Sequence, residues 1–459
     1  MAENNDLLDE IRSRLELEVS ERSVTEAYEE YFKASDEVRI IVELQSKPGI
    51  VIATEKNTSY DSLSVAEQQA ISRRLDLEQQ AVKSEINRRL VGMTFKNSFT
   101  VAMNGFSGTV RFDRIKMIEN LPNVKKVYLS NEYEKPEVEI NMNTSNALVS
   151  AYETWALDYL GEGRVVAVLD TGIDYTHRDM VLAEDVEVAL TEAEVNGLGL
   201  LGKYFTKKVP YGYNYFDLSN EVIDKGPDPS MHGQHVAGTV GANGNPEEGG
   251  IKGVSPHAQL LAMKVFSNDP LFPSTYSDIY LVAIDESIKL GADVINMSLG
   301  STASFFIEDS AENVALQNAI DNGIVAAVSA GNSGHIAHGG ASIGQPFGDY
   351  PWVQNADIGV VGAPGLNAPT ISVASLENSS FQARFLTFMV GEEKKTAVMT
   401  PAGPVDPSTV PANTEYVDGG FGDPSLFPDV TGKVVLIQRG GPSAFAPFTE
   451  KIINAANAG

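Results

Sequence analysis

The chain has 459 residues, with 34 Lys and Arg against 62 Asp and Glu, so its formal net charge is −28. This charge argues against nucleic-acid backbones and anionic membrane surfaces as main partners, because both would repel an acidic protein. The absence of cysteine excludes disulfides, thiolate catalysis and zinc–thiolate sites. No apolar run approaches the roughly 20 residues that a membrane-spanning helix needs. Length alone predicts about three domains.

The first part of the chain predicts a small α+β domain. Residues 1–35 are a polar lead-in with a short amphipathic helix, and an ordered periodic pattern begins at residue 36. It alternates as strand, helix, two strands joined at Asn104-Gly105, short helix and strand, over residues 38–44, 63–91, 99–103, 106–112, 113–121 and 124–129. This order is the split βαβ pattern of a ferredoxin-like domain, here bounded at 36–135. Residues 136–150 are polar and read as a linker.

A different pattern follows over residues 151–375. Continuous apolar runs alternate with helical ones, which indicates a parallel sheet covered on both faces, an α/β architecture. The strand-like runs are 164–170, 258–266, 292–300 and 323–331, and the helical runs are 233–242, 276–290 and 308–322. Ligand sites in such sheets lie at the carboxyl ends of the strands. From residue 376 to 459 the chain is rich in Pro, Gly, Thr and Ser, with short strands predicted at 385–390 and 433–438, which favours a separate, mostly β module.

Asp170 and His232 are the first candidate pair. Asp170 ends an apolar strand, where it could be a turn former or a buried carboxylate that orients a histidine. His232 opens the glycine-rich stretch HGQHVAGTVGA, where it could equally be a capping residue. A metal site at His232 and His235 is disfavoured, because no third ligand has the usual spacing. Together, an aspartate that fixes a histidine tautomer and stabilises its cation forms the couple used for general-base catalysis.

Two further candidates follow other strands of the predicted sheet. Asn332 lies in VSAGNSG, where it could be a turn residue or an amide donor to an oxyanion. Ser298, Leu299 and Gly300 end another strand, whose edge could pair with an extended peptide.

These stretches, taken in order, resemble subtilisin-like serine proteases (subtilases). VVAVLDTGIDYTHRDM, HGQHVAGTVGA, GIKGVSPHAQLLAMKVF, VINMSLG and VSAGNSG resemble five successive family blocks. The resemblance implies that Asp170 orients His232, that His232 is the general base, and that His235 is structural. It implies that Asn332 binds the oxyanion and that Ser298, Leu299 and Gly300 line the substrate cleft. No cofactor is then needed for the chemistry, although a structural calcium is possible, with Asp179 as a weak candidate ligand.

The flanking regions resemble parts of larger subtilase precursors. Residues 36–135, with NGFSG at 104–108, resemble the inhibitory propeptide, which implies a zymogen whose own propeptide blocks the cleft and is cut within 136–150. Residues 376–459 resemble the start of a protease-associated domain, as in lactocepin-type cell-envelope proteinases, and GKVVLIQRGGPSAFAPFTEKIINAANAG, at 432–459, resembles the core of that domain. The resemblance implies polypeptide substrates and a secreted or cell-envelope location, although residues 1–18 carry no signal-peptide pattern.

The sequence departs from the family in two places. The motif GTSxAxP, which carries the nucleophilic serine, does not occur, so we expect this serine beyond Gly459 and expect residues 1–459 to be inactive alone. The alternative is a pseudoprotease that binds peptides without cleaving them. The second departure is the long interval between Asp170 and His232, where we expect residues 183–228 to form loops around the cleft.

Overall fold

The computed structural model describes residues 23–135, 145–225, 229–301, 307, 309–332, 361–367, 370–376, 384–399, 410–411, 413–438 and 448–459. The chain divides into two compact units: residues 1–331 with 361–379, and residues 332–360 with 380–459. Each unit is described by itself. The predicted linker 136–150 lies mostly outside the described residues, as do residues 1–22.

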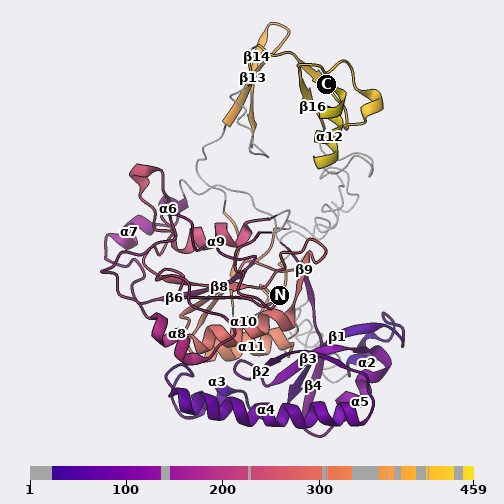
Figure 1. Ribbon diagram of the computed structural model, residues 1–459, viewed down its shortest axis with the longest axis vertical. Helices are drawn as coiled ribbons and strands as arrows, with labels where there is room; N and C mark the ends of the chain where they lie inside the picture. The colour runs from indigo at the N-terminus through magenta and orange to yellow at the C-terminus, as the bar shows by residue number, and fades with distance from the viewer. Residues whose placement is uncertain are drawn as a thin grey trace, which may run out of the picture. The chain divides into compact units, whose positions relative to one another are not determined.

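The first unit begins with a four-stranded antiparallel sheet in the order β2-β3-β1-β4 (Figure 1). This order and these directions are those of the split βαβ arrangement. Val82 and Ile86 of the long helix α4 are buried in one cluster with Val42 and Phe106 of the sheet. The elements are α2 (Val24–Tyr28), β1 (Glu37–Leu44), α3 (Gly49–Glu55), α4 (Val65–Arg88), β2 (Thr94–Phe99), β3 (Gly105–Arg111), a 3-10 turn (Phe112–Arg114), α5 (Ile115–Glu119), β4 (Val124–Leu129) and β5 (Glu132–Glu134).

Helix α4 forms where the sequence predicts it, and its first turn is well specified. Ser64 accepts the Glu67 N–H, and the Glu67 side chain accepts the Ser64 N–H, which is a capping box. The predicted strand over 99–103 is wrong, because β2 ends at Phe99. The next three backbone N–H groups, from 100 to 102, donate to the carboxylate of Asp285 instead of to a neighbouring strand. Helix α3 was not predicted.

A six-stranded sheet forms the centre of the first unit, in the order β12-β11-β10-β6-β8-β7. Every neighbouring pair is parallel, which confirms the predicted α/β class with a parallel sheet. Helix α9 lies on one face, and α10 and α11 lie on the other (Figure 1). The elements are β6 (Val165–Asp170), α8 (Glu192–Leu198), β7 (Tyr211–Asn214), α9 (His232–Gly241), β8 (Gln259–Lys264), β9 (Ser274–Tyr276), α10 (Ser277–Lys289), β10 (Val294–Met297), α11 (Ala311–Asp321), β11 (Val325–Ser329) and β12 (Ile371–Val373); α6 (Ser145–Leu148), α7 (Ala151–Trp155) and a 3-10 turn (Pro246–Glu248) complete this unit.

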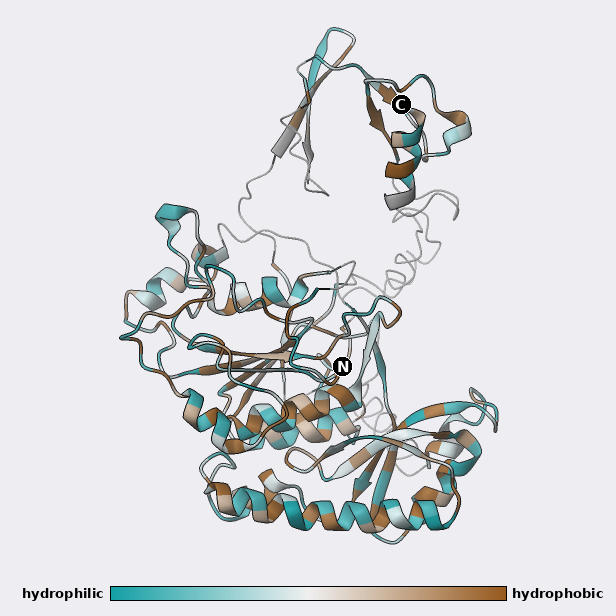
Figure 2. Ribbon diagram, in the orientation of Figure 1, coloured by the Kyte–Doolittle hydropathy of each residue, from teal (hydrophilic) through white to brown (hydrophobic). Residues whose placement is uncertain are grey.

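The central strands are buried on both faces, which explains their continuous apolar runs. All six residues of β6 and all six of β8 are buried, and brown, the colour of hydrophobic residues, predominates in the interior of the parallel sheet in Figure 2. Alternate residues of β6 face opposite sides. Ala167 belongs to a buried cluster with Ile284 of α10, whereas Val168 belongs to a separate cluster with Ala237 of α9. Both faces of β6 are therefore packed against helices, and the carboxyl end of the strand lies between these two layers.

The expectation that residues 183–228 are loops is wrong in part. This segment contains helix α8 and strand β7, and β7 extends the sheet by pairing in parallel with β8. The reason is aromatic burial: Tyr211 and Tyr213 of β7 are buried, and the Tyr211 hydroxyl donates to the carboxylate of Glu286 on α10. A segment that buries such side chains at a sheet edge gains more from pairing than from remaining a loop.

The second unit contains short strands and one helix among its described residues. β13 (Arg384–Val390) and β14 (Glu393–Met399) form an antiparallel hairpin, and β15 (Tyr416–Asp418) pairs in parallel with β16 (Val434–Leu436). Both strands predicted in this region are present, at β13 and β16. A 3-10 turn (Pro424–Leu426) and helix α12 (Phe448–Ala458) complete the described elements. Within the described residues of the whole chain, no helix has the length and apolar character needed to cross a membrane.

Candidate active site

Asp170 is the last residue of β6 and its side chain is buried. Its Oδ1 atom accepts two hydrogen bonds, from the Thr171 N–H at 2.6 Å and from Nδ1 of His232 at 2.7 Å. These donors offset the cost of burying a carboxylate. A bond from Nδ1–H to a carboxylate fixes the tautomer and leaves Nε2 as the ring nitrogen that can take up a proton. The structure thus brings together the two residues that the sequence predicts as a couple.

His232 is placed by the start of helix α9. The residue before it, Met231, has φ 56° in the left-handed region, and the helix begins at His232. The next residue must be glycine, because a Cβ atom on Gly233 would lie 2.5 Å from the Gly172 carbonyl oxygen and 3.0 Å from the Asp170 Cβ. The Gly233 N–H donates to Thr171 Oγ1 at 2.9 Å. The helix therefore approaches the end of β6 closely enough for the imidazole to reach the aspartate.

Two charged residues that sequence reasoning missed support this pair. Lys264 lies opposite Asp170 in the β6–β8 register, and its buried ammonium donates to the Thr171 carbonyl. Burial lowers the pKa of Lys264 to about 8, and the nearby Asp224 carboxylate opposes this shift. Asp224 Oδ2 accepts the Met231 N–H at 3.0 Å, which fixes the residue before His232. A lysine at the end of an otherwise apolar strand was the available signal in the sequence.

His235 lies one turn after His232 and has a different environment. Its Nε2 is buried and has no hydrogen-bond partner among the described residues. Burial, and then the proximity of His232, lowers the pKa of His235, so the neutral imidazole is favoured. The described residues contain no cluster of three or more His, Asp or Glu that could hold a metal ion. His235 therefore packs in the helix beside the couple without joining it.

Ser298, Leu299 and Gly300 follow β10 at the same edge of the sheet as Asp170. Contacts from within the chain fix this segment. The Leu299 carbonyl accepts the Ser329 hydroxyl at 3.1 Å, and the Ser301 N–H donates to the Ala363 carbonyl at 2.9 Å.

Asn332 is exposed and lies three residues after the end of β11. It falls in the second compact unit, whereas the couple belongs to the first. The structure therefore gives no distance between Asn332 and His232.

The surroundings of Asp179 do not fit calcium. Calcium takes six to eight oxygen ligands, but Asp179 Oδ2 accepts the Ile251 N–H at 3.1 Å and Oδ1 lies 3.6 Å from Nε of Arg178. A Cβ atom on Gly244 would lie 2.2 Å from Oδ1, so this loop packs directly on the carboxylate. Asp179 therefore anchors the loop from Gly244 to Ile251, and a structural calcium stays a prediction without a described site.

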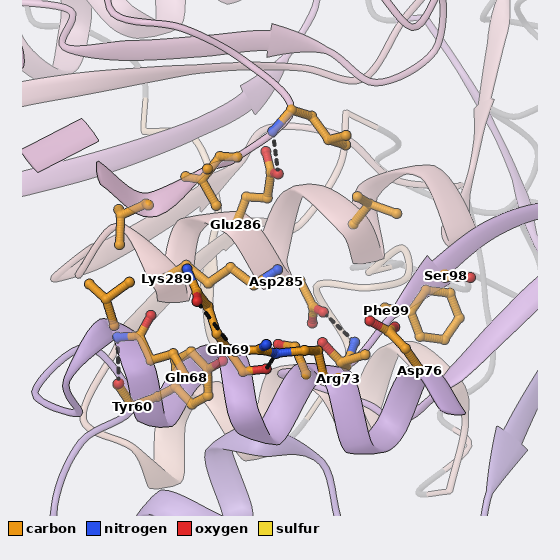
Figure 3. A pocket seen from close by; sticks show the side chains of 18 residues that line it. Tyr60, Gln68, Gln69, Arg73, Asp76, Ser98, Phe99, Asp285, Glu286 and Lys289 are labelled. Atoms are coloured by element: carbon orange, nitrogen blue, oxygen red, sulfur yellow. Dashed lines mark hydrogen bonds between the residues drawn. The ribbon is translucent and has the colours of Figure 1, made fainter. Parts of the chain in front are cut away.

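A hollow elsewhere in the first unit lies between α4 and α10 (Figure 3). Its labelled lining includes Tyr60, Arg73, Asp285 and Lys289, but neither member of the couple. Burial raises the pKa of Asp285, while Lys289 and the three backbone N–H donors act in the opposite direction. The hollow belongs to the contact between the N-terminal sheet domain and α10, away from the couple.

Comparison with known proteins decides the family. A model of the subtilase family, peptidase S8, matches residues 161–425, which is more than half of the chain. This chain belongs to the subtilase family. Membership supports a proteolytic function and assigns the parallel-sheet region to the subtilase domain, as the sequence predicts.

Several relatives of this subtilase are proteinases by name. It is 33% identical over 428 residues to the PII-type proteinase of Lacticaseibacillus paracasei, covering 88% of this chain and 21% of the relative. It is 28% identical over 438 residues to the minor extracellular protease Vpr of Bacillus subtilis (strain 168), covering 90% of this chain and 46% of the relative. This subtilase thus spans about a fifth of the first relative and under half of the second.

Among solved structures, the epidermin leader peptide processing serine protease of Staphylococcus aureus matches with a TM-score of 0.42 and 15% identity, over 76% of this chain and 71% of that one.

Proposed function

We propose that the protein of which this chain forms a part is a serine endopeptidase that cleaves polypeptides with Asp170, His232 and a serine outside residues 1–459. The observation that carries the proposal is the 2.7 Å contact between Asp170 Oδ1 and His232 Nδ1 at the carboxyl end of β6, in a member of the subtilase family. Binding of peptides alone would not require this couple. The far greater length of the relatives supports a nucleophile outside this sequence.

The proposed reaction follows from the orientation of the imidazole. Nε2 of His232 takes the proton from the serine hydroxyl as the serine oxygen attacks the peptide carbonyl. The carbon–nitrogen bond then breaks, and the same proton passes from Nε2 to the leaving amine. Water, deprotonated by Nε2, attacks the acyl-enzyme, and the proton returns to the serine. Asp170 remains ionised throughout and stabilises the imidazolium ion.

Two segments complete the proposed site. The Asn332 side chain would donate to the oxyanion of the tetrahedral intermediate, a contribution of about 10²–10³ in rate; that figure was measured in subtilisin, a member of this family. Residues 298–300 would line the cleft along which the extended substrate binds. No cofactor is required for these steps.

The N-terminal sheet domain, residues 36–135, is proposed to be an inhibitory propeptide acting within its own chain. Strand β5 pairs antiparallel with β9, the strand that immediately precedes α10. Asp278 of α10 accepts from Arg39, Asn97 and Ser130, and the domain presents three backbone N–H groups to Asp285. A domain held in this way would block substrate until cleavage within 136–150.

The second unit and the cellular location of the protein are also matters of proposal. The region 376–459, with its short strands and α12, would form part of a protease-associated domain. The name of the Bacillus relative includes the word extracellular, which supports a secreted or cell-envelope location for this protein.

The proposal is tested with the protein extended through its serine. We expect His232→Ala to lower kcat for casein hydrolysis by about 10⁴-fold or more, because the serine loses its base. His257→Ala is the matched control, since His257 is a histidine of the same domain that bonds to Glu162 and not to Asp170. Near-normal hydrolysis by His232→Ala would contradict the proposal.

A further inference from the structure

The chain segment that follows β4 runs along an edge of the parallel-sheet domain. Within it, Glu132 pairs with Tyr276, Tyr133 with Thr275 and Glu134 with Ser274 in an antiparallel ladder. The ladder continues by one bond, because the Lys135 N–H donates to the Pro273 carbonyl at 2.7 Å. Backbone pairing therefore determines where the side chain of Lys135 lies.

That side chain ends in a nearly buried ion pair. Nζ of Lys135 lies 2.9 Å from Oδ1 of Asp224, and the two side chains are 16% and 1% exposed. The other oxygen of Asp224 accepts the Met231 N–H at 3.0 Å, and Met231 immediately precedes His232. The acceptor of this lysine therefore hydrogen-bonds to the residue that immediately precedes the candidate general base.

The charges around Asp224 favour a second cation in addition to Lys264. Asp170 and Asp224 both attract the single buried ammonium of Lys264, whose hydrogen bond goes to the Thr171 carbonyl. Burial would raise the pKa of Asp224, but Lys135, Lys264 and the Met231 N–H outweigh it, so the carboxylate is held ionised. The 1% exposure of the Asp224 side chain is that of the carboxylate with Lys135 packed against it, and removal of Lys135 takes away its paired cation. If Lys135 leaves, another cation is the favoured replacement.

We infer that Asp224 is a binding site for a lysine or arginine side chain of the substrate, on the acyl side of the bond that is cut. Lys135 occupies this site while the N-terminal domain is in place. A substrate that adds to the edge of β9 in the direction of β5 makes the same backbone ladder, so one of its side chains reaches Asp224 as Lys135 does. This inference rests on the proposed peptidase function and adds a specificity determinant to it.

The test uses the protein extended through its serine, with its N-terminal domain removed by its own processing. The substrates are fluorogenic peptides in matched pairs that carry either lysine or norleucine at each of the four acyl-side positions beyond the first. Norleucine keeps the length of lysine without the ammonium group. We expect the lysine peptide to have a kcat/KM about tenfold higher or more at one position, as one buried ion pair can supply.

The enzyme variants separate this inference from the proposed function. Asp224→Asn keeps an acceptor for the Met231 N–H, and we expect its lysine-to-norleucine ratio to fall to about one. Glu221→Gln is the matched control: Glu221 is partly exposed, pairs with Lys225 and accepts the Ile223 N–H, which glutamine can still accept, so its ratio is expected to stay at the wild-type value. Because each ratio is taken within one enzyme, a change in basal rate does not affect it.

The possible results are distinct. Hydrolysis without a lysine preference at any position, or a preference that Asp224→Asn leaves unchanged, would overturn the role of Asp224 and leave the peptidase proposal intact. If no peptide of either kind is hydrolysed, the proposed function fails and this inference fails with it.

Discussion

Buried carboxylates occur in two regions of this subtilase and accept hydrogen bonds from different kinds of donor. At the carboxyl edge of the parallel sheet, Asp170 accepts one backbone N–H and one imidazole. On the outer face of α10, Asp285 accepts three consecutive backbone N–H groups from the N-terminal domain. Both side chains are almost completely buried. The difference lies in the donor: an imidazole has a second nitrogen available for chemistry, whereas a backbone amide has none.

The comparison shows that burial of a carboxylate alone does not identify a catalytic residue. Asp285 has a raised pKa, caused first by burial, and lies beside a hollow, two features often associated with active sites. Among the described residues its hydrogen-bond donors are nevertheless the main-chain groups of residues 100–102, which suits holding a segment in place.

The largest effect is expected at Asp170. In the protein extended through its serine, Asp170→Asn should lower kcat by about 10⁴-fold, because the amide no longer holds the Nδ1–H tautomer or stabilises the imidazolium ion. The matched change Asp217→Asn alters a carboxylate that bonds to Asn214 and Ser267 away from His232, and should leave kcat within a few-fold. Steady-state hydrolysis of one fluorogenic peptide measures both. Equal losses in the two variants would remove the distinction.

An intermediate effect is expected at Asp285. Asp285→Ala leaves three N–H groups without an acceptor and should lower the free energy of unfolding by about 3 kcal/mol or more. Asp285→Asn should cost less, because one oxygen remains as acceptor. Hydrogen exchange at Thr100, Val101 and Ala102 should accelerate most in the alanine variant. Unchanged exchange at these three amides would contradict the holding role of Asp285.

The smallest effect is a pH dependence at His235. Its pKa is lowered from the ordinary 6.5, by burial first, so the folded protein favours the neutral ring. The stabilisation is therefore fully present above about pH 6.5 and is lost as the pH falls below that value. His235→Gln should show a smaller fall in the free energy of unfolding between pH 7 and pH 5 than the wild type. An identical fall in both proteins would show that His235 does not titrate in this way.

Much of the fold could be predicted because its signals are local. The four predicted parallel strands are present at β6, β8, β10 and β11, since apolar runs of this length are typical of strands buried on both faces. The sequence predicts Asp170 and His232 as a couple because Asp170 ends an apolar strand, His232 begins a glycine-rich helix, and both stretches resemble subtilase blocks.

What the sequence could not predict depends on contacts between distant segments. The pattern at 99–103 alternates like a strand, but Asp285, more than 180 residues later, takes its N–H groups. Likewise, nothing near Lys135 in the sequence indicates Asp224. Such pairings arise from tertiary packing, which local periodicity does not record.

The central claim is that the Asp170–His232 couple serves a serine outside residues 1–459. The most direct measurement is to label the extended protein with a fluorophosphonate, which reacts with activated serines, and to map the modified residue by mass spectrometry. The account predicts one labelled serine, located after Gly459, whose labelling is lost in His232→Ala. Label on a serine within residues 1–459, or no label at all, would contradict the account.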